Sequence, residues 1–125
     1  MSDNPGALKD SYNILSKLCA LISKFSKDFR YSFWEKIENY AIDTVAEISL
    51  TTKVFWFEEK IQHLSTAKKD VEIINILLKV CHDSNKLSHK DYDEINNDLN
   101  ELFNQITKRE SFCRIKLKER SDLLK

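Results

Sequence analysis

The sequence has almost no glycine or proline, since Gly6 and Pro5 are the only such residues among 125. A glycine-rich phosphate loop, a dinucleotide-binding fingerprint and a GxSxG nucleophile elbow all need the positive φ angles or close backbone approach that glycine supplies. The chain after Gly6 therefore excludes all three. An all-β domain is also disfavoured, because its tight turns use glycine and proline. The length fits one domain, and we predict an all-α fold.

An excess of charge of one sign is also missing, because 20 Lys and Arg residues balance 20 Asp and Glu residues. Such a balance predicts no strong overall attraction to nucleic acid or membrane. The distribution is uneven, however. Residues 1–107 carry 13 basic and 17 acidic side chains, a net charge of −4, whereas residues 108–125 carry seven basic and three acidic ones, a net charge of +4. Any preference for a polyanion is therefore expected to be local.

Long apolar runs and paired cysteines are absent as well. No uninterrupted apolar stretch approaches the roughly 18 residues that cross a bilayer, so we expect a soluble protein with no membrane partner. The three cysteines are odd in number and more than 30 residues apart, which is typical of reduced thiols in a cytoplasmic protein. We expect Cys19 and Cys81 to fill the core as small apolar side chains.

Apolar residues recur at the three- and four-residue spacing of amphipathic helices. This pattern predicts helices over residues 10–25, 32–50 and 55–84. The second begins with Ser32-Phe33-Trp34-Glu35, which matches the capping box that satisfies two backbone amides at a helix start. We therefore expect Ser32 to be its N-cap.

The next break is expected at Asn85, because asparagine tolerates the left-handed conformation that closes a helix. Ser88, followed by Asp91, predicts the N-cap of a fourth helix that continues toward the end of the chain. We therefore predict an up-down-up-down four-helix bundle over residues 10–109. A flexible N-terminal lead over residues 1–9 precedes it, and a basic, helical C-terminal extension over residues 110–125 follows.

The predicted third helix carries two apolar stripes. One has the spacing of a bundle seam, and the second comprises Ile73, Leu77 and Val80. At 100° per residue the two stripes cover more than half the circumference of the C-terminal half of this helix, which is more than one core needs. We expect the excess apolar surface to contact another subunit.

Patterns for catalysis and metal binding are missing. Di-iron bundles carry Glu-x-x-His on two helices, but here a lysine stands three positions before each of the three histidines. The pair Glu59 and His63 falls short of the four ligands of a structural zinc site. Cys81 and His82 diverge by about 100° on a helix and cannot pair as nucleophile and base. We predict no enzymatic activity, no metal and no cofactor.

Basic side chains form two candidate contact surfaces for a polyanion. Lys68, Lys79 and Lys86 are 11 and 7 residues apart, which places them within about 20° of one line along the third helix. We expect this line to lie opposite the apolar seam, where an ordinary solvated helix face is the alternative interpretation. Arg114 and Lys116 belong to the basic extension, whose local positive charge is the stronger signal.

Two blocks of sequence resemble a known protein family. Lys24-Phe25-Ser26-Lys27, Arg30-Tyr31-Ser32 and Ala41-Ile42-Asp43 are similar to the signature KFPK-x-x-R[FY]-[ST]-L-x-x-R-I-x-x-x-A-L-D. Residues 71–83 resemble that family's third helix, L-x-x-L-R-x-L-L-R-L-A-x-D, and residues 87–92 resemble its restart, L-[LI]-S-x-x-x-Y. The family comprises the accessory variability determinant proteins of diversity-generating retroelements and the four-helix proteins of ribosomal-RNA intervening sequences. The resemblance covers about residues 10–108.

The resemblance implies a homopentamer that binds the retroelement's reverse transcriptase and template RNA and is not itself an enzyme. By position it implies that Arg30 and Lys79 face nucleic acid. The helical line adds Lys68 and Lys86, and the charge of the extension adds Arg114 and Lys116. Two hypotheses follow: an accessory subunit that binds reverse transcriptase and RNA or DNA, or a pentameric four-helix scaffold with a protein partner and no nucleic-acid role.

Overall fold

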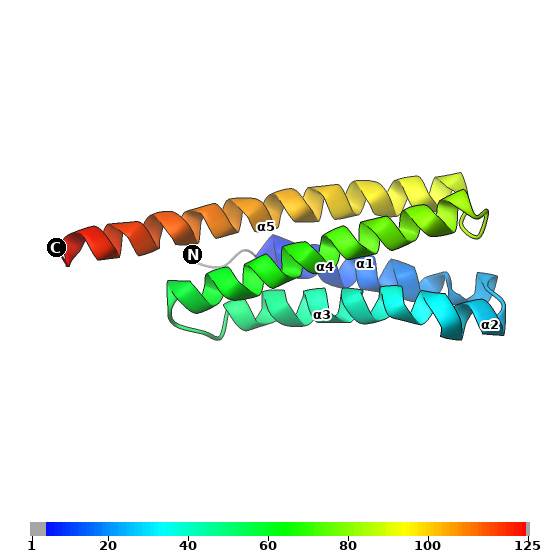
Figure 1. Cartoon of the computed structure of the whole chain (residues 1–125), viewed down its shortest axis with the longest axis horizontal. Helices are drawn as coiled ribbons and strands as arrows, with labels where there is room; N and C mark the ends of the chain where they lie inside the picture. Colours follow the sequence, from blue (N-terminus) through cyan, green and yellow to red (C-terminus); the bar gives the residue numbers. More distant parts are fainter. Residues whose placement is uncertain (1–4, 125) are drawn as a thin grey trace.

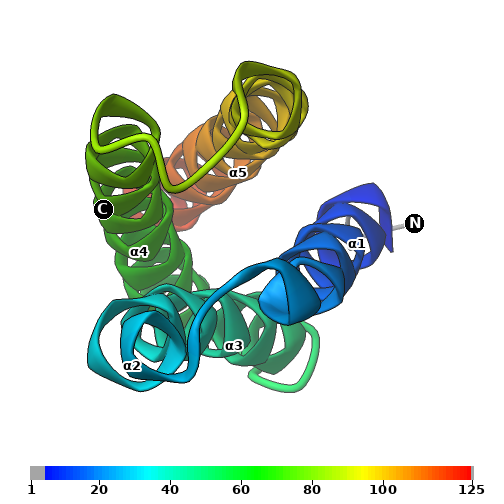
Figure 2. The ribbon, with the colours of Figure 1, turned by 90° about the vertical axis from the view of Figure 1, so that its right-hand side faces the viewer.

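The computed structural model describes residues 5–124. Over this range the backbone is helical and contains no strand, which confirms the predicted all-α fold class. Successive long helices run in opposite directions (Figure 1), and each packs against two neighbours around a common core, in the order α1, α3, α4, α5 (Figure 2). The four long helices are α1 (Pro5–Ala20), α3 (Glu35–Thr51), α4 (Phe57–Asp83) and α5 (His89–Leu123).

The core is built from one apolar stripe on each long helix. In α4 the buried apolar side chains follow helical spacing: Ile61, Leu64, Ala67, Val71, Ile74, Leu78 and Cys81. Burial raises the pKa of the Cys81 thiol to about 11. Cys113 is also buried, but Cys19 is exposed, so the prediction that Cys19 fills the core is wrong. Cys19 follows the core residue Leu18 directly and is rotated by about 100° away from the core direction.

The first helix begins earlier than we predicted. α1 starts at Pro5, so residues 5–9, which we expected in the flexible lead, form its first turns; residues 1–4 lie outside the described residues. Proline is favourable in the first turn of a helix, because backbone N–H groups in that turn have no carbonyl partner within the helix and proline therefore loses no hydrogen bond there. Ala7 is buried and Leu8 packs against the core, which extends the apolar stripe of α1 toward the N-terminus.

The predicted N-cap at Ser32 is wrong. A short 3₁₀ turn η1 (Ile22–Lys24) ends α1, and the next helical segment then starts at Ser26, whose Oγ accepts a hydrogen bond from the Phe29 amide at 3.2 Å. The segment continues through α2 (Lys27–Phe29) and the π-helical turn η2 (Arg30–Trp34) into α3 without a break, so Ser32 lies in a helix interior.

The π turn explains why the capping-box pattern predicted the wrong N-cap. A π turn inserts one extra residue and shifts the side-chain register relative to an α-helix. After this shift Trp34 is fully buried, and its Nε1–H donates to the carbonyl of Leu18 at 3.1 Å. Phe25 packs on the Trp34 ring at a centroid distance of 4.5 Å and on Phe29 at 5.0 Å. These aromatic residues close one end of the core.

The connection between α4 and α5 agrees with the prediction. Asn85 has a φ of 60°, and the amides of Asn85 and Lys86 donate to the carbonyls of His82 and Cys81 at 3.1 and 2.8 Å. This pair of bonds is the Schellman motif, which closes a helix. Ser88 is the N-cap of α5, because its Oγ accepts from the Asp91 amide at 3.1 Å.

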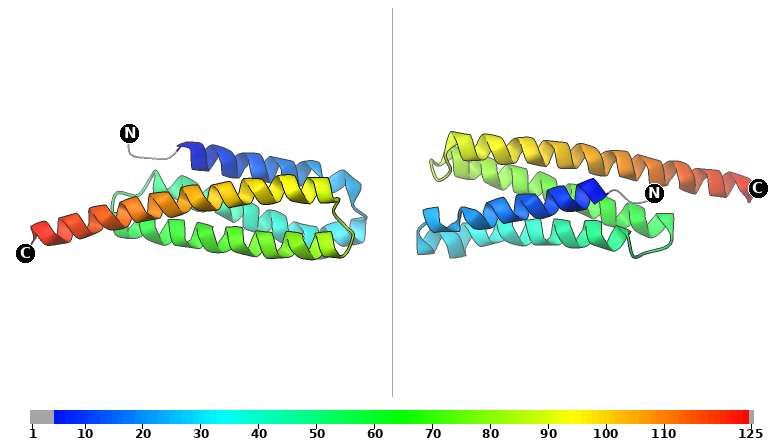
Figure 3. Two further views of the ribbon diagram at one scale, coloured as in Figure 1. Left: turned by 90° about the horizontal axis from the view of Figure 1, so that it is seen from above. Right: turned by 180° about the vertical axis from the view of Figure 1, so that it is seen from behind.

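The last helix is continuous to Leu123, and its C-terminal turns run beyond the ends of the other helices (Figures 1 and 3). Core packing does not stop at residue 109, since Glu110 and Cys113 are buried and Leu117 packs against the core. Arg120 pairs with Glu58, and its guanidinium lies 5.5 Å from the Trp56 ring. The extension is therefore attached to the start of α4.

Within the described part of the chain, none of the helices combines the length and the apolar character that crossing a membrane requires.

Candidate functional site

The six basic residues that we predicted to contact nucleic acid do not form one surface. Two of them meet between α4 and α5, and the others are spread over both ends of the molecule and the outer face of α4. The pair is Lys68 and Arg114; the separate residues are Arg30 in the π turn, Lys79 on α4, Lys86 in the α4–α5 connection and Lys116 near the end of α5.

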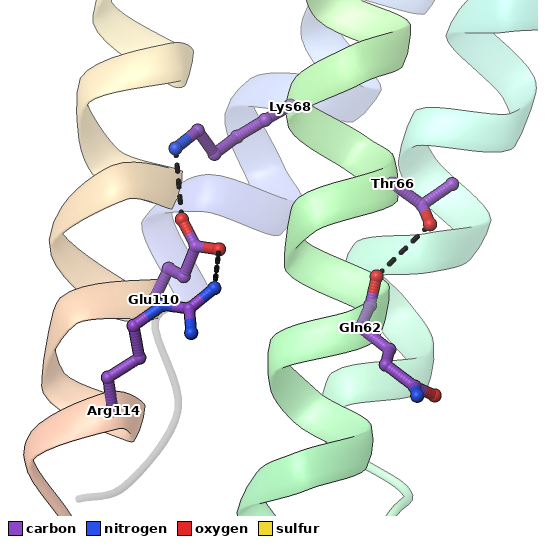
Figure 4. Close-up of polar contacts among 5 residues, drawn as sticks. All are labelled: Gln62, Thr66, Lys68, Glu110 and Arg114. Atoms are coloured by element: carbon purple, nitrogen blue, oxygen red, sulfur yellow. Dashed lines mark hydrogen bonds and ion pairs between the residues drawn. The ribbon is translucent and has the colours of Figure 1, made fainter.

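Lys68 and Arg114 share one carboxylate (Figure 4). Lys68 Nζ lies 2.9 Å from Glu110 Oε1, and Arg114 donates to Glu110 Oε2 at 3.0 Å. The Lys68 ammonium also lies 5.2 Å from the centroid of the Phe103 ring. The expectation that Lys68 lies on a solvated line opposite the seam is therefore wrong. α4 packs against α3 on one side and α5 on the other, so a residue outside the apolar seam of α4 can still contact α5.

Glu110 is a buried anion with two cations. Burial alone would raise the pKa of this carboxyl, but the hydrogen bonds from Lys68 and Arg114 together outweigh burial and lower the pKa below its ordinary value. Hydrogen bonds and ion pairs to the charged form have this effect on any carboxyl group. The cluster therefore holds α4 and α5 together and leaves Lys68 little capacity for a phosphate.

Lys79 and Lys116 are exposed and have weaker partners on their own helices. Lys79 Nζ lies 3.6 Å from Asp83 Oδ2, and Lys116 Nζ lies 3.4 Å from Glu119 Oε1. Exposed pairs of this kind contribute little to stability. Both lysines remain accessible, but the neighbouring carboxylates reduce the local positive charge.

Arg30 and Lys86 form no ion pair with any of the residues that the structure describes. The Arg30 guanidinium lies 5.7 Å from the Tyr31 ring, and the Lys86 ammonium lies 5.7 Å from the Phe29 ring. Arg30 lines a hollow of about 150 Å³ together with Glu35 and Glu38. These two residues are the unpaired cations of the predicted set, and the surface around Arg30 is mixed in charge.

The groove between α3 and α4 contains a feature that our sequence reasoning missed. Asp70 is only 6% exposed, and its Oδ2 atom has no hydrogen-bond partner. The groove has a volume of about 440 Å³, and its lining residues are Lys36, Asn39, Tyr40, Asp43 and Asp70. A signal was present in the sequence, because Asp70 stands three residues after Ala67 and four before Ile74, inside the buried stripe of α4.

The groove brings two carboxyl groups, Asp43 and Asp70, close together, and Lys36 is the one basic side chain among its lining residues. Burial and the neighbouring carboxyl of Asp43, with a smaller effect of Glu47, raise the pKa of Asp70 to about 7. His63 does not compensate Asp70, because its Nδ1 lies 2.6 Å from Glu47 Oε1. The groove is therefore suited to receive a positively charged group.

The seam between α1 and α5 is polar, and most of its charged groups are paired, although Gln105 Oε1 is buried without a hydrogen-bond partner. Lys17 Nζ lies 2.6 Å from Asp98 Oδ2 and 2.8 Å from Glu94 Oε2, and Gln105 donates to Asp10 Oδ2 at 2.7 Å. The hydrogen bonds to Asp98 and Glu94 raise the pKa of Lys17. Across residues 5–124, no group of three or more His, Cys, Asp or Glu side chains has an arrangement that could hold a metal ion.

No protein-family model, curated protein or solved structure matches this chain.

Proposed function

We propose that this protein is a non-enzymatic accessory subunit of a diversity-generating retroelement. In this proposal an up-down-up-down four-helix bundle assembles as a homopentamer in the cytoplasm and binds the reverse transcriptase and its template nucleic acid. The resemblance of residues 24–43 and 71–92 to that family supports the proposal. One structural observation carries it, namely the outer apolar surface of α4.

This surface, the α4 outer stripe, comprises Ile73, Ile76, Leu77 and Val80. Ile76 is 63% exposed and Val80 is also exposed, whereas Ile73 and Leu77 are half-buried. Contiguous apolar residues on a protein surface mark a contact with another macromolecule. Assembly of several copies through this stripe would remove it from water, as the predicted pentamer requires.

Nucleic acid would bind at Arg30 and Lys86, because neither has a carboxylate partner among the described residues. Counterion release from single-stranded nucleic acid contributes about −0.7 to the slope of log K against log salt for each phosphate. Two contacts per protomer predict a slope of roughly −1.4. Binding should therefore be weak for one protomer and depend on the number of copies in the assembly.

The second candidate is the pentameric scaffold with a protein partner and no nucleic-acid role. A specific observation favours it: Lys68, Lys79, Arg114 and Lys116 all have acidic partners. In this candidate the α4 outer stripe and the grooves of the bundle contact the protein partner, and the basic residues stabilise the fold through their ion pairs.

The experiment that separates the two candidates is an affinity purification of the intact chain from its native host, followed by sequencing of bound RNA and mass spectrometry of bound protein. The retroelement proposal expects a reverse transcriptase, its template RNA and a pentamer by light scattering. Arg30→Glu with Lys86→Glu should abolish RNA retention, and Lys118→Glu, an exposed charge reversal elsewhere, should not. A pentamer that retains a protein partner but no nucleic acid at low salt would establish the scaffold instead.

A further inference from the structure

The groove between α3 and α4 has the properties of an incomplete binding site. Its floor contains Asp70, which is buried and has an oxygen without a partner, beside the carboxyl of Asp43. A buried polar atom without a partner costs free energy that a suitable ligand recovers on binding. The two carboxyl groups outnumber Lys36, the one basic residue of the lining, and therefore favour a cationic ligand.

Apolar side chains adjoin the groove. Ile73 and Leu77 stand three and seven residues after Asp70, so helical spacing places them on the same strip of α4, next to the residues that line the groove. Tyr40 lines the groove from α3. All three side chains are half-buried. The occupant should therefore combine positive charge with apolar surface on one face.

The end of α5 presents such a face. Phe112 and Ile115 are 42% and 58% exposed. Lys108 and Lys116 stand four residues before and after Phe112, so helical periodicity places them on the same side. Residues 108–125 carry a net charge of +4, against −4 for the rest of the chain. We refer to Lys108, Phe112, Ile115 and Lys116 as the α5 ridge.

The α5 ridge cannot reach the groove of its own chain. α5 packs against α4 and α1 and lies across the bundle from α3 (Figure 2). It is one uninterrupted helix to Leu123, and its last turns lead away from the bundle (Figure 3). The ridge is therefore available only to another molecule.

We propose that the α5 ridge of one copy of this chain docks in the α3–α4 groove of a second copy. The basic residues of the ridge would approach Asp43 and Asp70, and Phe112 with Ile115 would cover Tyr40, Ile73 and Leu77. The contact is head to tail, because the two copies contribute different surfaces, and such contacts close into rings when the rotation between copies permits. The inference rests on the assembly in the proposed function and names two surfaces that take part in it; of the α4 outer stripe, this contact includes Ile73 and Leu77.

The test uses two full-length variants. The groove variant is Asp43→Lys, in which the new ammonium occupies the acidic site beside Asp70, and the ridge variant is Phe112→Glu with Ile115→Glu. Light scattering should show that each variant alone loses the wild-type assembly. Mixed together they should form a one-to-one complex and nothing larger, because only one intact ridge and one intact groove remain.

Matched controls are Glu35→Lys on α3 and Lys118→Glu on α5, both at exposed positions outside the two surfaces; both should assemble as the wild type does. Circular dichroism melts check the fold of every variant. If Asp43→Lys fails to fold, Asn39→Lys takes its place, since Asn39 is exposed and lines the same groove.

Three outcomes contradict different statements. Groove and ridge variants that keep the wild-type mass overturn this inference and leave the proposed function intact. A wild-type chain that is monomeric at micromolar concentration overturns the inference together with the pentamer. Loss of assembly in each variant, with a one-to-one complex on mixing and no capture of reverse transcriptase or nucleic acid by the wild type, supports the inference and overturns the proposed function.

Discussion

α4 packs against α3 on one side and against α5 on the other, and each of these two contacts buries one carboxyl group. The pKa values of the two groups shift in opposite directions. Asp70 on the α3 side is 6% exposed and Glu110 on the α5 side is 8% exposed. The pKa of Asp70 rises to about 7, whereas the pKa of Glu110 falls below its ordinary value. Burial raises the pKa of both, so the difference comes from the neighbouring side chains.

Glu110 receives hydrogen bonds from Lys68 and Arg114. Asp70 instead faces the carboxyl groups of Asp43 and Glu47, and Lys69 lowers the pKa of Asp70 only to a smaller extent. The α4–α5 seam is therefore complete within one chain, and the α3–α4 groove is not. A carboxyl group that stays buried with no ion pair identifies a surface where an external cation would bind favourably.

The largest expected effect comes from breaking the completed cluster. Lys68→Met keeps an apolar stem near Phe103 but leaves Glu110 with Arg114 alone. Removing one partner of a buried ion pair costs about 3 kcal/mol of unfolding free energy. Urea melts at pH 7 measure this loss. Lys53→Met, at an exposed position outside the cluster, should change stability by less than about 0.5 kcal/mol, and equal losses in both variants would contradict our account of Glu110.

The next effect comes from removing the uncompensated charge. The pKa of Asp70 is higher in the folded state than its ordinary value of 3.8, so the folded state binds more protons between these two values. The free energy of unfolding therefore decreases as pH rises from about 4 through about 7. Asp70→Asn should stabilise the protein by about 2 kcal/mol at pH 8, by less than half as much at pH 5, and have little effect below about pH 4.

Thermal melts of Asp70→Asn across this pH range check the sign, with Asp93→Asn, an exposed carboxyl on α5, as the control. Glu110 should have the opposite pH dependence. Folding lowers the pKa of Glu110. Its contribution to the free energy of unfolding is therefore fully present above the ordinary pKa value of 4.5 and is lost as the pH falls through the folded-state pKa. A wild-type stability that rises from pH 5 to pH 8 would contradict the assignment of Asp70.

A smaller effect is expected when the α3–α4 groove receives a cation of its own. Asn39→Arg places a guanidinium among the groove residues beside Asp43 and Asp70 and should stabilise the protein by about 1 kcal/mol at pH 8, near the upper end for an exposed pair. The gain should be smaller in the Asp70→Asn background, where Asp43 alone remains as a partner, and a double-mutant cycle measures the difference. A gain of equal size in both backgrounds would show that Asp70 is not the partner.

The smallest effect concerns the helical segment that positions the α3 wall of the groove. Ser26→Ala removes the observed N-cap and should cost about 0.5 to 1 kcal/mol. Ser32→Ala, at the position that the capping pattern favours, should cost less than about 0.5 kcal/mol, because Ser32 is exposed inside the π turn. Urea melts that rank the two variants in the reverse order would restore the original prediction.

Several features of the fold could be predicted because they depend on residues close in the chain. Asn85 and Ser88 act within one turn of backbone, and both have the predicted roles. The predicted third helix, residues 55–84, differs from α4 by two residues at its start and one at its end. Ser32 was mistaken for the N-cap because Trp34 is buried in the core, and its contact with Leu18 is 16 residues distant in the chain.

The basic residues of the candidate site illustrate the same limit. Helical periodicity correctly identifies residues on a common line, but it does not indicate which side of α4 faces α5. Lys68 therefore belongs to an ion cluster with Glu110, 42 residues later, while Lys79, 11 residues away on the same predicted line, stays exposed.

The sequence by itself determined that this protein is helical, where α4 ends and α5 begins, and that α4 carries more apolar surface than one core needs. These properties follow from local backbone preferences and from the period of the apolar residues. Only the tertiary structure decided which buried carboxyl group receives hydrogen bonds from cations and which does not, because that depends on the neighbours that α3 and α5 bring to the two sides of α4. Which charged side chains pair between helices depends on the packing geometry. The sequence pattern does not give the distances between residues on different helices.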